Sequence, residues 1–128
     1  MQTVGTHPTD EHGDDVGAAR REYLASIGNL DAAYRGLNET LLHATAALIA
    51  LRSYLERHGS AREFFTDVQP MPLRSDLTHA LDGLERARHE SIRLLYRLLQ
   101  AEGSTKADIA RTFGVSRQLV SRLLGETD

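Results

Sequence analysis

A repeat of apolar residues through the first half of the chain limits the folds that are open to it. The repeated positions are alternately four and three residues apart, and they are Tyr23, Ile27, Leu30, Tyr34, Leu37, Leu41, Ala44, Leu48, Leu51 and Leu55. This spacing keeps apolar side chains on one stripe of an α-helix, whereas a half-buried strand alternates at every second residue. The pattern therefore predicts a long helix from about Arg20 to Arg57.

A second long helix is predicted in the C-terminal half, after Pro70 and Pro72 break the chain. Ser75 is a suitable N-cap for this helix, and Glu102–Gly103 is a suitable end. Its apolar stripe consists of Leu77, Leu81, Leu84, Ile92, Leu95 and Leu99. The two long helices together predict a helical hairpin of coiled-coil character.

The other local patterns are also helical. Ser60 and Glu63 form a capping-box pattern, which predicts a short helical turn that carries Phe64, Phe65 and Val68. Aromatic residues make up only 5% of the chain and Trp is absent, so the core must come from Leu, Ile and Ala. No alternating stretch is long enough for a sheet. These observations predict an all-α fold.

The first predicted helix is longer than the segment that can cover it. It measures roughly 57 Å at 1.5 Å per residue, and the second measures roughly 42 Å. Part of the stripe is left without a partner, unless the first helix is interrupted near Gly28, where glycine costs about 1 kcal/mol relative to alanine. A homodimer is expected to form through Ile27, Leu30, Tyr34, Leu37, Leu41 and Leu48. A hairpin that packs only within one monomer is the alternative.

Composition and periodicity divide the chain into three parts. Residues 1–17 are rich in Thr, Gly, His, Asp and Pro and have no apolar period, so a disordered acidic leader is expected there. Residues 18–87 hold the helical dimerisation or interaction region. Residues 88–125 form a separate C-terminal unit.

Two short helices are predicted between residues 103 and 124. Thr105 caps the first helix, with Asp108 as its reciprocal capping partner. Gly114 follows this helix directly, where a tight turn requires a positive φ, and Ser116 caps the second helix. The predicted inner faces consist of Ile109, Ala110 and Phe113 in the first helix, Val115 in the turn, and Leu119, Val120 and Leu123 in the second.

This segment resembles the helix-turn-helix of bacterial transcription regulators and of the DNA-binding domain of resolvase and invertase recombinases. The matching residues are Ile109-Ala110, Phe113-Gly114-Val115-Ser116-Arg117, Val120 and Arg122-Leu123. With Ile92, Leu95 and Leu99 on the first helix of a trihelical unit, the resemblance covers residues 88–125, under a third of the chain. A recombinase is set aside, because the upstream segment is a helical heptad pattern and not an α/β catalytic domain.

The resemblance implies that the second short helix, residues 117–124, lies in the major groove of double-stranded DNA. Base-reading roles are expected for Arg117, Gln118, Ser121 and Arg122. Phosphate contacts are expected for Thr105, Lys106 and Ser116. The implied protein is a dimeric bacterial transcriptional regulator. The alternative is a helical protein-interaction adaptor, similar to an antitoxin, in which the C-terminal hairpin is only structural.

The distribution of charge fits DNA binding better than the formal net charge of −3. Residues 85–124 contain 8 basic and 4 acidic residues, a net of +4, whereas residues 1–84 contain 7 basic and 12 acidic residues, a net of −5. Such asymmetry suggests a C-terminal part that faces a polyanion. The overall acidity argues against a non-specific nucleoid protein, because non-specific binding rests on positive charge.

Other functional classes lack the residues that they need. Cysteine is absent, which excludes disulfides, thiolate zinc sites and cysteine nucleophiles. The 6 His residues have no metal-ligand spacing, and phosphate-binding glycine loops and Gly-x-Ser-x-Gly motifs are missing. We expect no enzyme activity, metal or cofactor. The sequence has no apolar run long enough to span a bilayer and no secretion signal. We therefore expect no membrane partner and a cytoplasmic, nucleoid-associated location. The N-terminal helices offer a surface for a protein partner.

Overall fold

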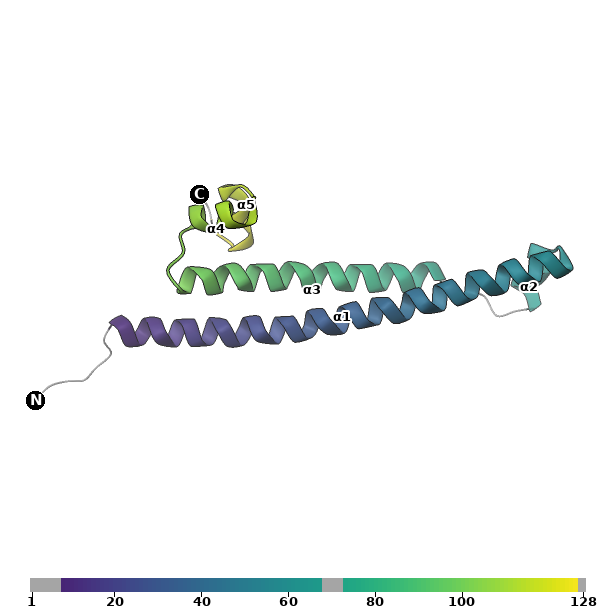
Figure 1. Ribbon diagram of the computed structural model, residues 1–128, viewed down its shortest axis with the longest axis horizontal. Helices are drawn as coiled ribbons and strands as arrows, with labels where there is room; N and C mark the ends of the chain where they lie inside the picture. Colours follow the sequence, from purple (N-terminus) through teal and green to yellow (C-terminus); the bar gives the residue numbers. More distant parts are fainter. Residues whose placement is uncertain (1–7, 68–72, 127–128) are drawn as a thin grey trace, which may run out of the picture. The chain divides into compact units, whose positions relative to one another are not determined.

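The computed structural model describes residues 8–67 and 73–126, and within them the regular structure is entirely helical. The helices are α1 (Pro8–His58), α2 (Ala61–Asp67), α3 (Leu73–Ala101), α4 (Lys106–Phe113) and α5 (Arg117–Leu123), as labelled in Figure 1. The predicted all-α fold class is confirmed. No helix in this part of the chain is long and apolar enough to cross a membrane.

The chain divides into two compact units. Unit 1 joins the chain up to Leu30 with Ala87–Asp128, and unit 2 consists of Asp31–Arg86. The sequence did not reveal that the first part of α1 belongs with the C-terminal helices, because periodicity identifies a helix but not its partner.

The first helix begins earlier than expected and is not interrupted. α1 starts at Pro8, so residues 8–17 of the predicted disordered leader are helical, while residues 1–7 of that leader lie outside the described residues. A helix that has already formed is extended cheaply, because each added residue gains a hydrogen bond without a new nucleus. Proline is also well suited to a first helical position. Gly28 lies inside α1 and does not have a positive φ, which settles the question of an interruption.

The predicted apolar stripe of α1 is divided between a covered row and an exposed row. Covered positions recur every three or four residues, and they are Tyr23, Ser26 and Leu30 in unit 1 and Ala33, Leu37, Thr40, Ala44, Ala47 and Leu51 in unit 2. Exposed apolar positions are Leu24 and Ile27 in unit 1 and Tyr34, Leu41, Leu42, Leu48, Ile49 and Leu55 in unit 2. Small side chains occupy much of the covered row, so the row that packs within the chain is not the most hydrophobic one.

The short helix α2 is held against α1 by aromatic contacts. Ser60 caps it, since the Ser60 hydroxyl accepts a hydrogen bond from the backbone N–H of Glu63 at 3.1 Å. Phe64 is buried and its ring centroid lies 5.3 Å from that of Tyr54. Phe65 is exposed, and Val68 lies outside the described residues. The predicted helical turn is therefore confirmed for the described part.

The start of α3 differs from the expectation, whereas its end agrees. α3 begins at Leu73, so Ser75 is a residue within the first turn and not the N-cap. Leucine and arginine at positions 73 and 74 have high helix propensity, which favours extension past the serine. At the other end, Gly103 has a φ of 106° and Ser104 donates its N–H to the Leu99 carbonyl at 2.9 Å, which is a Schellman ending.

A small core joins the last turns of α3 to α4 and α5, which Figure 1 draws beside one another. Its buried members are Tyr96, Ile109, Val120 and Leu124. The partly buried hydrophobic residues around them are Ile92, Leu99, Ala110, Val115 and Leu123. Most of the predicted inner faces are therefore confirmed. Phe113 was expected on the inner face but is 42% exposed, because its ring packs on the edge of this core against Tyr96, with centroids 5.3 Å apart.

Gly114 is required by the conformation of the turn between α4 and α5. Its φ of 65° lies in the left-handed region, and its N–H bonds to the Ala110 carbonyl. A Cβ at this position meets nothing within 4 Å, so the cost of a side chain comes from the backbone alone. The positive φ predicted from the sequence is confirmed.

We expect Gly114→Val to lower the free energy of unfolding by about 1–2 kcal/mol, because a Cβ is penalised in the left-handed region. Gly28→Ala is the matched control, since Gly28 is helical and an added Cβ there also meets nothing within 4 Å. That control is expected to stabilise the protein by about 0.5–1 kcal/mol. Denaturant titration of both variants measures the difference. Equal stability of Gly114→Val and the unmodified protein would contradict this account of the turn.

Candidate nucleic-acid interface

The N-terminus of α4 is built by a reciprocal capping box. The Thr105 hydroxyl accepts a hydrogen bond from the Asp108 N–H at 3.0 Å, and the Asp108 carboxylate accepts one from the Thr105 N–H at 2.9 Å. The carboxylate also pairs with Arg111 at 2.6 Å. These contacts confirm the predicted cap and fix the first turn of α4, which carries Lys106.

The capping box also sets the acidity of Asp108. Hydrogen bonds from the Thr105 backbone and side chain hold the pKa of the Asp108 carboxyl below its ordinary value, with a smaller contribution from the charge of Arg111. A carboxyl whose pKa is lowered in the folded state stabilises that state above the pKa of the unfolded chain. The contribution is lost as the pH falls through the lowered value.

We therefore expect the melting temperature to fall as the pH is lowered below about 4, and part of this fall to come from Asp108. Asp108→Asn keeps a side-chain acceptor for the cap but has no carboxylate to protonate, so its melting temperature is expected to depend less on pH in this range. Glu102→Gln, which also removes one carboxylate from unit 1, is the control. Identical acid dependence of Asp108→Asn and the unmodified protein would contradict the assignment.

Three polar side chains of α5 are exposed to solvent. Ser116 caps the helix, since its hydroxyl accepts a hydrogen bond from the Leu119 N–H at 3.0 Å. Arg117, Gln118 and Arg122 are all exposed. Gln118 and Arg122 are four residues apart and so lie one above the other, on the side of α5 opposite the fully buried Val120. Three of the four predicted base-reading residues are thus available on one short helix.

Ser121 was expected to face outward with these residues, and that expectation is wrong. Its side chain is only 2% exposed. On a helix with 100° between residues, Ser121 lies about 60° from Leu124, which is buried in the small core. Ser121 therefore packs inside unit 1 and has no access to a base in this conformation.

The predicted phosphate contacts lie at the two helix starts. Thr105 and Ser116 are exposed, and both hydroxyls accept capping hydrogen bonds. The Thr105 side chain is also engaged with the Asp108 carboxyl, so it must leave that carboxyl before it can donate to a phosphate. The Lys106 ammonium forms an ion pair with Glu126 at 2.9 Å, and its side chain is 20% exposed. Glu126 therefore competes with a phosphate for the Lys106 ammonium.

Other arginines of unit 1 are also exposed, and Arg97 and Arg111 are two of them to which the sequence analysis assigned no role. Arg97 is exposed on α3, and the Arg111 side chain is 73% exposed on α4. Both were part of the basic excess between residues 85 and 124. Charge counting detects such residues, but only the packing of the three helices shows which of them reach the surface.

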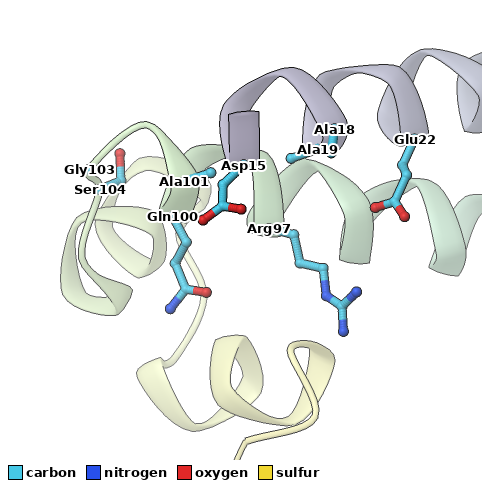
Figure 2. Close-up of a pocket in the computed structure, with 9 residues that line it drawn as sticks. All are labelled: Asp15, Ala18, Ala19, Glu22, Arg97, Gln100, Ala101, Gly103 and Ser104. Atoms are coloured by element: carbon cyan, nitrogen blue, oxygen red, sulfur yellow. The ribbon is translucent and has the colours of Figure 1, made fainter. Parts of the chain in front are cut away.

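A groove of about 660 Å³ lies in unit 1, between the N-terminal part of α1 and the end of α3. Figure 2 shows the carboxylates of Asp15 and Glu22 on the α1 side, with Arg97 and Gln100 on the α3 side. None of the predicted base or phosphate contacts lines it. The two carboxylates also make it unsuited to an anionic backbone, so the groove is separate from the candidate interface.

The predicted dimerisation residues do not share one environment. Leu30 and Leu37 belong to the covered row of α1, whereas Ile27, Tyr34, Leu41 and Leu48 are exposed. Leu30 and Leu37 are therefore partly covered within the chain, which leaves less of each side chain for contact with a second copy. The residues of the described part form no cluster of three or more His, Asp or Glu side chains that could hold a metal ion.

Comparison with known proteins does not assign this arrangement to a family. No protein-family model, no curated protein and no solved structure matches the chain.

Proposed function

We propose that the protein binds double-stranded DNA in a sequence-specific manner, with α4 and α5 as a helix-turn-helix and α5 in the major groove. The observation that carries the proposal is the exposure of Arg117, Gln118 and Arg122 on one short helix, with Gln118 and Arg122 on the side opposite the fully buried Val120. Arginine pairs with guanine and glutamine with adenine through two hydrogen bonds each. Because arginine and glutamine side chains project from the same rigid helix, they are suited to reading adjacent base pairs.

The surroundings of these three side chains of α5 support the proposal. α5 is short, but the buried core of Tyr96, Ile109, Val120 and Leu124 fixes it to α3 and α4, so its exposed side chains start from a rigid base. The N-terminus of α4 carries Lys106, and helix N-termini attract phosphate through unpaired N–H groups and the helix dipole. The basic excess of residues 85–124 adds the sequence-independent attraction that DNA binding needs.

The protein acts as a homodimer in this proposal, as a transcriptional regulator of bacterial type. One such module makes only a few base contacts, whereas two linked modules read two half-sites with higher combined affinity. The exposed apolar row of α1 supplies a surface for the second copy. The competing function is that of a helical adaptor, which binds another protein through the exposed apolar row of α1.

Recovery of DNA sites by the full-length protein tests the proposal. Random duplexes are mixed with the protein, bound duplexes are isolated over several rounds, and the enriched sequences are determined. We expect one motif to be enriched, with two related half-sites if the protein binds as a dimer. If no sequence is enriched over the starting library, the result contradicts sequence-specific binding.

The ion pair between Lys106 and Glu126 is expected to weaken DNA binding. Glu126→Gln frees the Lys106 ammonium and removes a negative charge, so we expect affinity for a selected duplex to rise about two- to fivefold, in line with the energy of exposed ion pairs. Lys106→Ala is expected to weaken binding evenly across sequences and to reduce the salt slope by about 1. Glu39→Gln, an exposed acid on α1, is the control for net charge. Unchanged affinity of both the Glu126 and Lys106 variants would exclude this phosphate contact.

A further inference from the structure

The unit that carries α5 is not basic as a whole. Within the boundaries of unit 1, residues 87–128 contain 7 basic and 5 acidic residues, and residues 1–30 contain 2 basic and 5 acidic residues. The 9 basic residues are therefore outnumbered by 10 acidic ones, and the formal net charge of the unit is −1. The N-terminal segment thus offsets the positive charge on which sequence-independent attraction to DNA depends.

Two of these acidic residues lie beside the C-terminal part of α3. Asp15 and Glu22 are seven residues apart, so they lie on the same side of α1, about 10 Å apart along its axis. They line the groove of unit 1 together with Arg97 and Gln100 of α3 (Figure 2). Both carboxylates are exposed, and neither forms an ion pair with another residue in the part of the chain that the structure describes.

The charge of Glu22 acts across the groove on α3. The pKa of the Arg93 guanidinium is raised mainly by its hydrogen bond to Glu90, and the negative charge of Glu22 raises it further. Arg97 follows Arg93 by four residues, so the two arginines lie on the same side of α3. Arg97 is therefore next to the position at which the charge of α1 already affects an arginine.

Arg97 is the arginine of the groove that is suited to binding an anion. It is exposed and forms no ion pair with the described residues, whereas Arg93 is paired with Glu90. A free guanidinium binds phosphate or sulfate groups through two parallel hydrogen bonds. A polyanion at Arg97 also comes close to Asp15 and Glu22, and charges repel one another over about 8 Å at physiological salt.

We propose that Asp15 and Glu22 keep polyanions away from Arg97, so that DNA has access to α4 and α5 but not to the groove side of unit 1. The two carboxylates determine specificity in this account, because they suppress a mode of binding that reads no bases. This consequence rests on the proposed function. The exclusion of polyanions from Arg97 is tested without any base contact.

Heparin, a sulfated polysaccharide, is the probe, since it carries many negative charges and no bases. Three variants of the full chain are prepared, namely Asp15→Asn/Glu22→Gln, Arg97→Ala, and the combination of all three changes. Glu39→Gln/Asp82→Asn changes two exposed acids of unit 2 and is the control for net charge. The salt concentration at which each protein elutes from immobilised heparin is measured, as is its affinity for a duplex of unselected sequence.

We expect Asp15→Asn/Glu22→Gln to elute from heparin at higher salt than the control. It is also expected to bind the unselected duplex about three- to tenfold more tightly than the control, in line with the energies of exposed charge contacts. Addition of Arg97→Ala is expected to remove this gain. In the unmodified protein, Arg97→Ala is expected to change both measurements little, because Arg97 there is already closed to polyanions.

Equal behaviour of Asp15→Asn/Glu22→Gln and the control would overturn the proposal, because the effect would then be one of net charge alone. An equal loss of binding on Arg97→Ala with and without the two carboxylates would also overturn it, since Arg97 would then be open to polyanions in the unmodified protein. Either failure leaves base reading by α5 to be judged from the site-selection experiment.

Discussion

Ile109→Ala is expected to lower the free energy of unfolding of unit 1 by about 2–5 kcal/mol, the usual cost of such a truncation in a packed core. Ile109 is 1% exposed and belongs to the core that holds α4 and α5 together. The loss has two parts, the apolar surface that is no longer removed from water and the cavity that remains. Since a small domain is stabilised by only about 5–15 kcal/mol, this single change removes a large share of the total.

Denaturant titration followed by circular dichroism measures this effect. Leu81→Ala is the matched control, because it removes a similar side chain from a position on α3 that is 45% exposed. The control is expected to lose far less stability, since little of its surface is buried. We also expect Ile109→Ala to lose DNA affinity near its melting temperature. Equal stability of the two variants would show that Ile109 does not hold unit 1 together.

Arg117→Ala is expected to weaken binding to a selected duplex by about 1–3 kcal/mol, which is roughly 5- to 150-fold in the dissociation constant. The reason is that a bidentate contact from arginine to guanine contributes both affinity and discrimination. Preference at one base pair of the site is expected to relax, while preference elsewhere is kept. This change in sequence preference distinguishes a base contact from a phosphate contact, because loss of a phosphate contact weakens binding to all sequences alike.

Fluorescence anisotropy with the selected duplex and with variants of each base pair measures both effects. Arg62→Ala removes the same charge from an exposed position on α2 and is the control for net charge. We expect this control to bind nearly as tightly as the unmodified protein. If Arg117→Ala and Arg62→Ala behave alike, Arg117 does not read a base.

The features that the sequence predicted correctly are those that depend on neighbouring residues. The capping box of Thr105 and Asp108, the cap at Ser116 and the positive φ of Gly114 each arise within four residues of chain. Hydroxyl and carboxylate groups bond to backbone N–H groups two or three residues away, so the pattern alone specifies the geometry. Local signals of this kind are sufficient to locate where α4 and α5 begin and where the turn between them lies.

The features that the sequence did not predict depend on packing between distant segments. Ser121 is only 2% exposed, and the pattern of α5 alone does not show which of its polar positions are covered by other segments of unit 1. The ion pair of Lys106 with Glu126 joins residues 20 apart in the chain. On α1, apolar residues spaced alternately by four and three positions leave two adjacent rows that could be covered by packing. In the structure, the covered row is the one that contains many small residues.

The dependence of affinity on salt tests the central claim most directly. The full-length protein is titrated with a selected duplex at several salt concentrations, and the logarithm of the association constant is plotted against the logarithm of salt concentration. DNA binding through phosphate neutralisation predicts a steep negative slope, about −0.9 for each phosphate that a basic side chain neutralises, and a shallower slope for Lys106→Ala. The helical adaptor predicts no binding even at low salt. A flat dependence on salt, or no binding to any duplex, would contradict the proposal that α4 and α5 form a DNA-binding unit.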